Sequence, residues 1–190
     1  MKTISLLTTT TLIILFFVSC KEESTPKPDG FLSLQYPQAT YESYTYASSY
    51  IKFSKNKWAD IKPEDNFSFK VDYPKMKASI YLNYRPINNN LELLLKDAQK
   101  LTYEHVVKAD DIQESIFEHP EKKVYGMFYR VIGNAATNVQ FYATDSTKNF
   151  VVGTLYFYAK PNFDSIYPAT KYIEEDMRVL MESLEWTNNK

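Results

Sequence analysis

The chain has 190 residues and a formal net charge of −1, from 22 Lys and Arg against 23 Asp and Glu. This balance argues against a nucleic-acid-binding protein, which normally carries a basic excess. The single cysteine excludes an internal disulfide, so a folded domain must be stabilised by its core. Aromatic residues make up 16% of the chain, and they favour the half-buried surface of a β-sheet.

The N-terminus predicts a bacterial lipoprotein signal. One positive charge precedes an uncharged run over residues 4–18, whose apolar core is too short for a membrane span of about 20 residues. The run ends in Phe17-Val18-Ser19-Cys20, close to a lipobox, although Leu is commoner than Phe at its first position. We predict a signal peptide at residues 1–19 and lipid, including palmitate, on Cys20. The alternative is an ordinary signal peptide followed by an accidental cysteine.

A tether and one domain are predicted after the lipidated cysteine. Residues 20–30 are polar and contain two prolines, which makes an extended tether. Residues 31–187 have a length suited to a single domain, and its first segment, 31–37, alternates enough for an edge strand. The tyrosines of segment 41–50 show no clean period, so this segment is either a loop over the core or a surface for a partner. The tyrosines assigned to partner binding are Tyr41, Tyr44 and Tyr46.

Two strands and a helix follow along the chain. Apolar and polar residues alternate over 67–73 and over 76–84, which predicts two half-buried strands joined by a tight turn. Asn89 can cap a helix, with Glu92 placed to reach back to the cap. The apolar positions that follow lie on one helical face, and we expect this helix to end near Ala109.

Three more strands are predicted in the C-terminal half. Beyond a polar segment around Pro120, strand patterns cover residues 124–132, 139–144 and 150–159. Turn-forming residues separate them, which is typical of an antiparallel meander.

A second helix begins at Asp164 or Ser165, where Pro168 falls in the first turn. Its predicted buried stripe is Ile166, Ala169, Ile173, Met177, Leu180, Met181 and Leu184, and Trp186 ends the ordered part. The element order indicates an α+β fold, with one antiparallel β-sheet and two amphipathic helices packed on it. By analogy the fold is similar to the PsbP- and Mog1-like sandwich, and a fold by itself does not determine function.

The sequence offers no persuasive active site, cofactor site or metal site. Its four glycines are too scattered for a phosphate-binding loop, and no G-x-S-x-G nucleophile motif is present. His105 and His119 with intervening carboxylates could assemble a zinc site, but their spacing matches no metal motif, and exposed histidines are the simpler interpretation. Adjacent carboxylates, including Glu174-Glu175-Asp176, are interpreted as surface charge rather than as a catalytic pair.

Several long strings of the chain resemble the GldD family of gliding-motility lipoproteins of the Bacteroidetes. The resemblance covers essentially the whole mature chain. The strings include Tyr73-Pro74-Lys75-Met76-Lys77-Ala78, Lys96-Asp97-Ala98-Gln99-Lys100-Leu101-Thr102-Tyr103, Glu121-Lys122-Lys123-Val124-Tyr125-Gly126-Met127-Phe128-Tyr129, Gly133-Asn134-Ala135-Ala136 and Leu155-Tyr156-Phe157-Tyr158-Ala159-Lys160-Pro161.

The resemblance implies a non-enzymatic envelope lipoprotein needed for gliding, which supports assembly or stability of the gliding and type IX secretion machinery. Its partners would be other envelope proteins of that machinery, and no catalytic residues are attributed to the family. On this hypothesis the partner surface lies on the tyrosine segment or around residues 134–138, with Asn134 and Asn138 as candidate contacts. The alternative is a lipoprotein that binds or acts on a small ligand in a pocket between sheet and helices.

The predicted location is the cell envelope, with the membrane anchor at Cys20. Lys21-Glu22-Glu23 resembles the charged signal that sends some Bacteroidetes lipoproteins to the cell surface. A plain solvated tether explains the same residues equally well. Family resemblance favours a domain that faces the periplasm.

Overall fold

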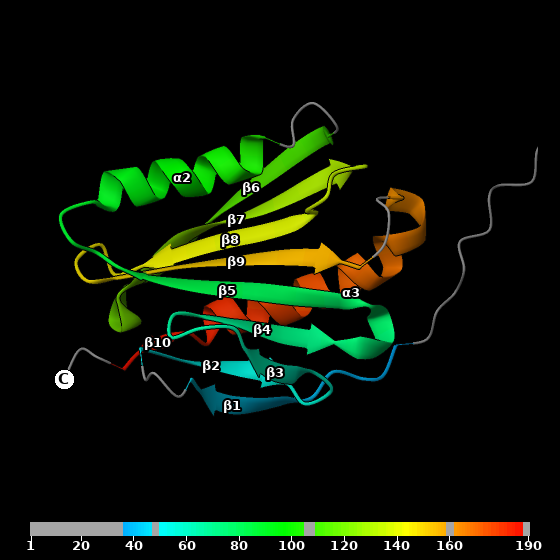
Figure 1. The fold of residues 1–190 in the computed structure, drawn as a ribbon, viewed down its shortest axis with the longest axis horizontal. Coiled ribbons are helices and arrows are strands. Elements are labelled where there is room, and N and C mark those ends of the chain that lie inside the picture. Colours follow the sequence, from blue (N-terminus) through cyan, green and yellow to red (C-terminus); the bar gives the residue numbers. More distant parts are fainter. Residues whose placement is uncertain (1–35, 47–49, 105–108, 159–161, 188–190) are drawn as a thin grey trace, which may run out of the picture. The chain divides into compact units, whose positions relative to one another are not determined.

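The computed structural model describes residues 36–46, 50–104, 109–158 and 162–187 (Figure 1). Its strands are β1 (Tyr41–Thr45), β2 (Ile51–Asn56), β3 (Asp60–Pro63), β4 (Ser68–Tyr73), β5 (Ala78–Pro86), β6 (Ala109–His119), β7 (Val124–Gly133), β8 (Val139–Thr144), β9 (Asn149–Phe157) and β10 (Glu185–Trp186). Its helices are α2 (Leu91–Tyr103) and α3 (Phe163–Glu182), and short 3-10 turns are η1 (Pro74–Met76) and η3 (Pro120–Lys122).

The strands form two antiparallel sheets. The larger has the order β3-β4-β5-β9-β8-β7-β6, and the smaller has the order β1-β2-β10. The predicted α+β class, with helices packed on antiparallel strands, is confirmed. The prediction of one sheet is wrong in number, because β1, β2 and β10 form a separate three-stranded sheet.

One apolar core joins α3, the inner face of the large sheet and the inner face of the small sheet. The α3 stripe predicted from the sequence supplies Ile173, Met177 and Leu180, each at most 1% exposed. Phe53 of β2 and Phe69 of β4 stack 5.7 Å apart between their centroids, so the two sheets share this core. Burying each such side chain stabilises the fold by about 1.5–3 kcal/mol.

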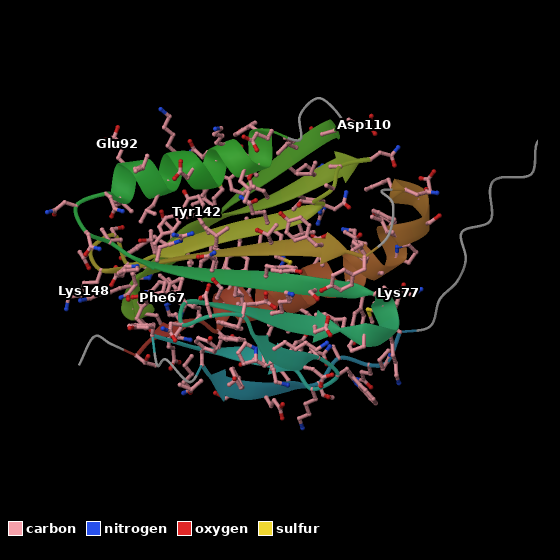
Figure 2. The ribbon with its side chains drawn as sticks, viewed as in Figure 1. Phe67, Lys77, Glu92, Asp110, Tyr142 and Lys148 are labelled. Atoms are coloured by element: carbon pink, nitrogen blue, oxygen red, sulfur yellow. The ribbon has the colours of Figure 1, made fainter. Side chains whose placement is uncertain are left out.

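The opposite face of the large sheet lies under α2. Figure 2 shows Tyr142 on this side, between the helix and the sheet, and its ring stacks on Phe150 at 5.6 Å. Gln140 donates from its side-chain nitrogen to the Ala98 carbonyl at 2.9 Å and to the Thr102 hydroxyl at 2.7 Å. These contacts fix α2 across the middle of the sheet.

Two hairpins of the large sheet use the same turn. In each, proline opens a single 3-10 turn, and a lysine in the left-handed conformation ends it, Lys77 at φ 50° and Lys123 at φ 52°. The lysine N–H donates to the proline carbonyl, at 3.2 Å in η1 and 3.1 Å in η3. The residue before each proline is held extended and so stays in its strand, and the proline then begins the turn.

The structure differs from the sequence-based prediction at several elements. Residues 36–40 are not in a strand, and the rest of the predicted first strand lies outside the described residues. The tyrosine segment is not a loop at its start, because residues 41–45 form β1. The first helix ends at Tyr103, and Ala109 instead begins β6. This strand is mostly exposed, so it lacks the apolar alternation that reveals a half-buried strand.

Neither of the helices in the described part of the chain is long and apolar enough to cross a membrane.

Candidate functional site

Helix α3 carries two buried carboxylates. Glu174 and Asp176 are 1% and 3% exposed, whereas Glu175 between them is exposed. The interpretation of this triplet as surface charge is therefore wrong for two of its three members. The reason is helical geometry, since positions 174 and 176 flank the buried stripe at 173 and 177.

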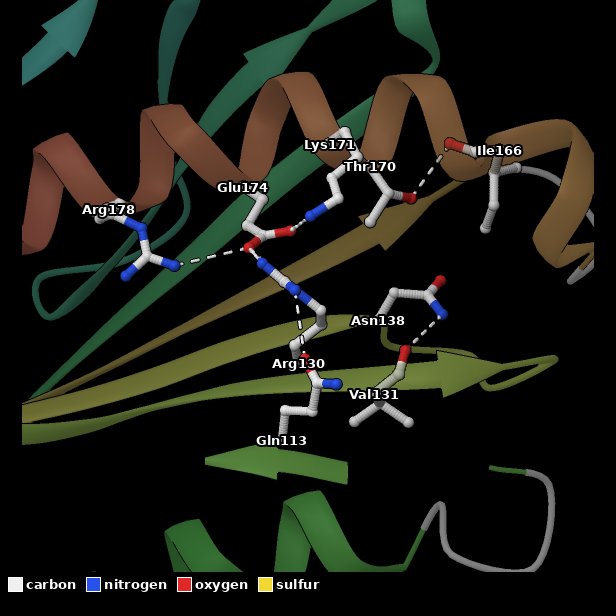
Figure 3. A network of polar contacts seen from close by, with 9 residues as sticks. All are labelled: Gln113, Arg130, Val131, Asn138, Ile166, Thr170, Lys171, Glu174 and Arg178. Carbon is white, nitrogen blue, oxygen red and sulfur yellow. Dashed lines mark hydrogen bonds and ion pairs between the residues drawn. The ribbon is translucent and has the colours of Figure 1, made fainter. Parts of the chain in front are cut away.

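Glu174 is surrounded by three cations (Figure 3). Arg130 of β7 donates through Nε at 2.9 Å and also through Nη2 to the same carboxylate oxygen. Lys171 lies 3.3 Å and Arg178 3.5 Å from the Glu174 carboxylate, one helical turn to either side. The hydrogen bond to Glu174 raises the pKa of Arg130. Three cations offset the charge of this carboxylate, and through Arg130 of β7 the network fastens α3 to the large sheet.

Asp176 accepts hydrogen bonds from three different parts of the fold. Its donors are the hydroxyls of Tyr41 at 2.8 Å and Tyr73 at 2.9 Å, and the Asn56 side-chain amide at 2.8 Å. Burial raises the pKa of Asp176, and the three donors oppose that rise by stabilising the ionised form. These hydrogen bonds join the small sheet and β4 to α3, so the cluster stabilises the fold.

The tyrosines assigned to partner binding mostly serve the core. Tyr41 is half-buried and committed to Asp176. Tyr46 is 6% exposed, stacks on Phe69 at 4.2 Å and donates to the Asp65 carbonyl at 2.6 Å. Tyr44 is half-buried beside Phe53. The sequence could not distinguish docking tyrosines from packing tyrosines, because both need aromatic residues on a strand.

The two asparagines assigned to partner binding have different environments. Asn138 is 2% exposed, and its side-chain amide donates to the carbonyls of Val131 and Gly133. Asn134 is exposed and accepts from the Phe163 backbone N–H at 2.8 Å. The tyrosine group meets α3 at Asp176 and Asn134 meets it at Phe163, about 20 Å apart at 1.5 Å per helical residue. They do not form one continuous patch, and the partner-binding role of all five residues stays a prediction.

Metal ligation finds no support in the part of the chain that the structure describes. No group of three or more His, Asp or Glu side chains there lies close enough to hold a metal ion. His119 ends β6, which also carries Asp110, Asp111 and Glu114, while His105 lies outside the described residues.

An apolar pocket of about 540 Å³ lies where the η1 turn meets the start of α3. Its volume is typical of ligand sites, which span about 300–1,000 Å³. Trp58 at this pocket is 54% exposed, and the Lys75 ammonium lies 5.7 Å from its ring centre. The lining of this pocket is chiefly apolar. The hydroxyl of Tyr73, one of the lining residues, donates its hydrogen bond to Asp176. Aromatic and apolar lining comes from Tyr36, Trp58, Tyr73, Met76, Phe157 and Ile166.

A second groove of about 420 Å³ runs between α2 and the sheet, and its lining includes Leu94, Val152 and Tyr156. The large sheet also ends in a long exposed strand, β6, in which seven of eleven residues are exposed. Sequence reasoning missed this strand and the Glu174 network. Their signals are weak because β6 has few apolar residues and the partners Arg130 and Glu174 are 44 positions apart.

Comparison with known proteins assigns the chain to a family. A comparison with curated proteins finds no match. Among solved structures the chain is similar to the PsbP protein CyanoP from Synechocystis sp. PCC 6803, with 9% identity and a TM-score of 0.45 over 78% of this chain and 93% of that one. The family model described as gliding motility lipoprotein GldD matches residues 21–186. The chain therefore belongs to the GldD family of gliding-motility lipoproteins, as its sequence strings had indicated.

Proposed function

We propose that this protein is a non-enzymatic subunit of the envelope machinery for gliding, and that it supports assembly or stability of the gliding and type IX secretion apparatus. The family match over residues 21–186 carries this proposal. The environments of Glu174 and Asp176 support the non-enzymatic part, since charge or hydrogen bonds from the fold itself satisfy both groups.

The proposed layout is a signal peptide at residues 1–19, a lipidated Cys20, a tether to residue 30 and a single domain over 31–187. The domain faces the periplasm and meets other proteins of the machinery. Among the five residues first assigned to the partner surface, exposed Asn134 and half-buried Tyr44 are the best placed to contribute.

Cys20→Ala is expected to release the protein from the membrane fraction and to abolish gliding, while the domain stays folded. Each CH₂ of a buried acyl chain contributes about 0.8 kcal/mol to anchoring, so losing all acyl chains removes the anchor. Fractionation of cell envelopes, colony spreading and circular dichroism of the purified domain measure the three expectations. Lys21→Ala is the matched control, because it alters the tether and keeps the lipid. Soluble Cys20→Ala protein that still supports gliding would show that the anchor is dispensable.

The apolar pocket beside Trp58 favours a second candidate function, the binding of an apolar ligand such as an acyl chain. We expect decanoate to bind the purified domain, measured by titration calorimetry. Ile166→Trp should weaken binding because the larger indole takes up part of the pocket, and Leu94→Trp in the other groove should leave binding unchanged. Equal binding by both variants would contradict this candidate.

A further inference from the structure

The large sheet presents one long open edge. Its order ends at β6, whose hydrogen-bonded neighbour among the described residues is β7 (Figure 1). The opposite edge, β3, is four residues long and ends in Pro63, which has no N–H to donate. By contrast β6 is eleven residues long and contains no proline. A strand edge of this length can accept an added strand from another chain through main-chain hydrogen bonds.

The side chains of β6 determine which kind of strand can pair with this edge. Along the side that faces α2, the strand alternates Ile112, Glu114, Ile116 and Glu118 at every second residue. The Tyr103 hydroxyl of α2 donates to Glu114 and marks this side. Ile116 is 75% exposed, more than any other large apolar side chain in the described part of the chain.

The charge of this edge disfavours a second copy of the same chain. Antiparallel pairing with a second copy would place Glu114 opposite itself in the register centred on Glu114, and opposite Glu118 in the register centred on Ile116. Like charges directly opposite each other destabilise a strand pair. Glu114 and Glu118 therefore disfavour pairing between two copies of this chain. The same charges attract a strand that carries basic side chains.

We propose that β6 is the docking edge for an extended basic segment of another envelope protein, which adds a strand to the large sheet. On the α2 side, the segment carries an apolar residue opposite Ile116 and Lys or Arg two positions to either side, opposite Glu114 and Glu118. This pattern is symmetric about Ile116, so it fits a parallel or an antiparallel strand. The inference rests on the proposed function and names the kind of partner that such a subunit holds.

Photo-crosslinking in living cells tests this docking edge. A photoreactive phenylalanine replaces Ile116 in the full-length lipoprotein, and the same probe at Lys148, in the β8–β9 turn, is the control position (Figure 2). We expect an adduct from Ile116 and none from Lys148. The crosslinked peptide, identified by mass spectrometry, should come from another envelope protein and carry Lys or Arg around an apolar residue.

Charge reversal gives the second arm of the test. Glu114→Lys with Glu118→Lys should lower the adduct yield by about tenfold, because two attractive cross-strand pairs become repulsive. Glu175→Lys with Glu182→Lys makes the same charge change on the exposed side of α3 and should leave the yield unchanged. Glu118→Lys alone should lower the yield in the same direction, and it leaves the Tyr103 contact intact should the double variant fold poorly.

Three outcomes would overturn the docking edge: no adduct above the Lys148 control, an adduct between two copies of this chain, or an adduct that survives charge reversal. These outcomes are separable from the proposed function. A strain that lacks the protein and still glides would refute the function. A strain that needs the protein, yet glides normally with both β6 charges reversed, would refute only the docking edge.

Discussion

Glu174→Ala is expected to lower the free energy of unfolding by about 3 kcal/mol, near the lower end of the range for breaking a buried ion pair. The substitution removes a carboxylate that is 1% exposed and leaves Arg130, Lys171 and Arg178 facing one another. These cations are about one-third exposed and can turn toward water, which keeps the loss from being larger. Urea denaturation of the purified domain at neutral pH measures it.

Glu175→Ala is the matched control for this network, since it removes the same group one residue away from an exposed position. Its expected effect is within about 0.5 kcal/mol. Glu174→Gln should fall between the two, because it keeps the shape and loses the charge. Equal unfolding free energies for Glu174→Ala and Glu175→Ala would show that the network does not fasten α3 to the sheet.

Gly153→Ala is expected to cost about 3 kcal/mol, at the upper end for overpacking a core. Gly153 of β9 pairs with Phe141 of β8, and a Cβ placed on the glycine would meet the Phe141 ring at 2.1 Å. Phe141 is fully buried, so its ring has nowhere to move. The glycine is needed for space rather than for an unusual backbone angle, since its φ is not positive.

A double-mutant cycle isolates this contact. Phe141→Ala alone should cost about 3–5 kcal/mol through the cavity it leaves. Combined with Gly153→Ala, the total loss should be smaller than the sum of the single losses by about 2 kcal/mol, because the new methyl occupies space that the ring has vacated. Thermal and urea denaturation of the four proteins give the coupling energy. Strict additivity would contradict the assigned contact.

The sequence predicted well those elements that are half-buried and locally patterned. Strands 67–73 and 76–84 and the α3 stripe show clear apolar periods, because one face of each lies in the core. Strand β6 has no such period, since most of it faces solvent. One signal was nevertheless present: His119-Pro120 and Lys123 repeat the arrangement of Tyr73-Pro74 and Lys77, and both hairpins use the same turn.

The hydrogen-bond and ion-pair partners of Glu174 and Asp176 could not be predicted from local sequence patterns, for a different reason. Glu174 looks like any helical surface glutamate until Arg130, on a strand 44 residues earlier, is placed beside it. The Asp176 cluster needs three donors from β1, β2 and β4, as far as 135 residues away. Burial of a charge depends on such distant partners, and a single sequence does not reveal which residues meet.

The small sheet has a consequence for the order in which the chain can fold. Its middle strand, β2, pairs with β10, which brings Lys52 beside Glu185 across 133 residues of chain. Trp186 then donates from its indole nitrogen to the Lys123 carbonyl at 2.9 Å. Strand β10 thus holds β2, which lies early in the domain. Contacts between residues so far apart in the sequence form slowly. The proposed signal peptide implies that the chain crosses a membrane unfolded. The pairing of β2 with β10 can then form only after residues 185–186 have crossed.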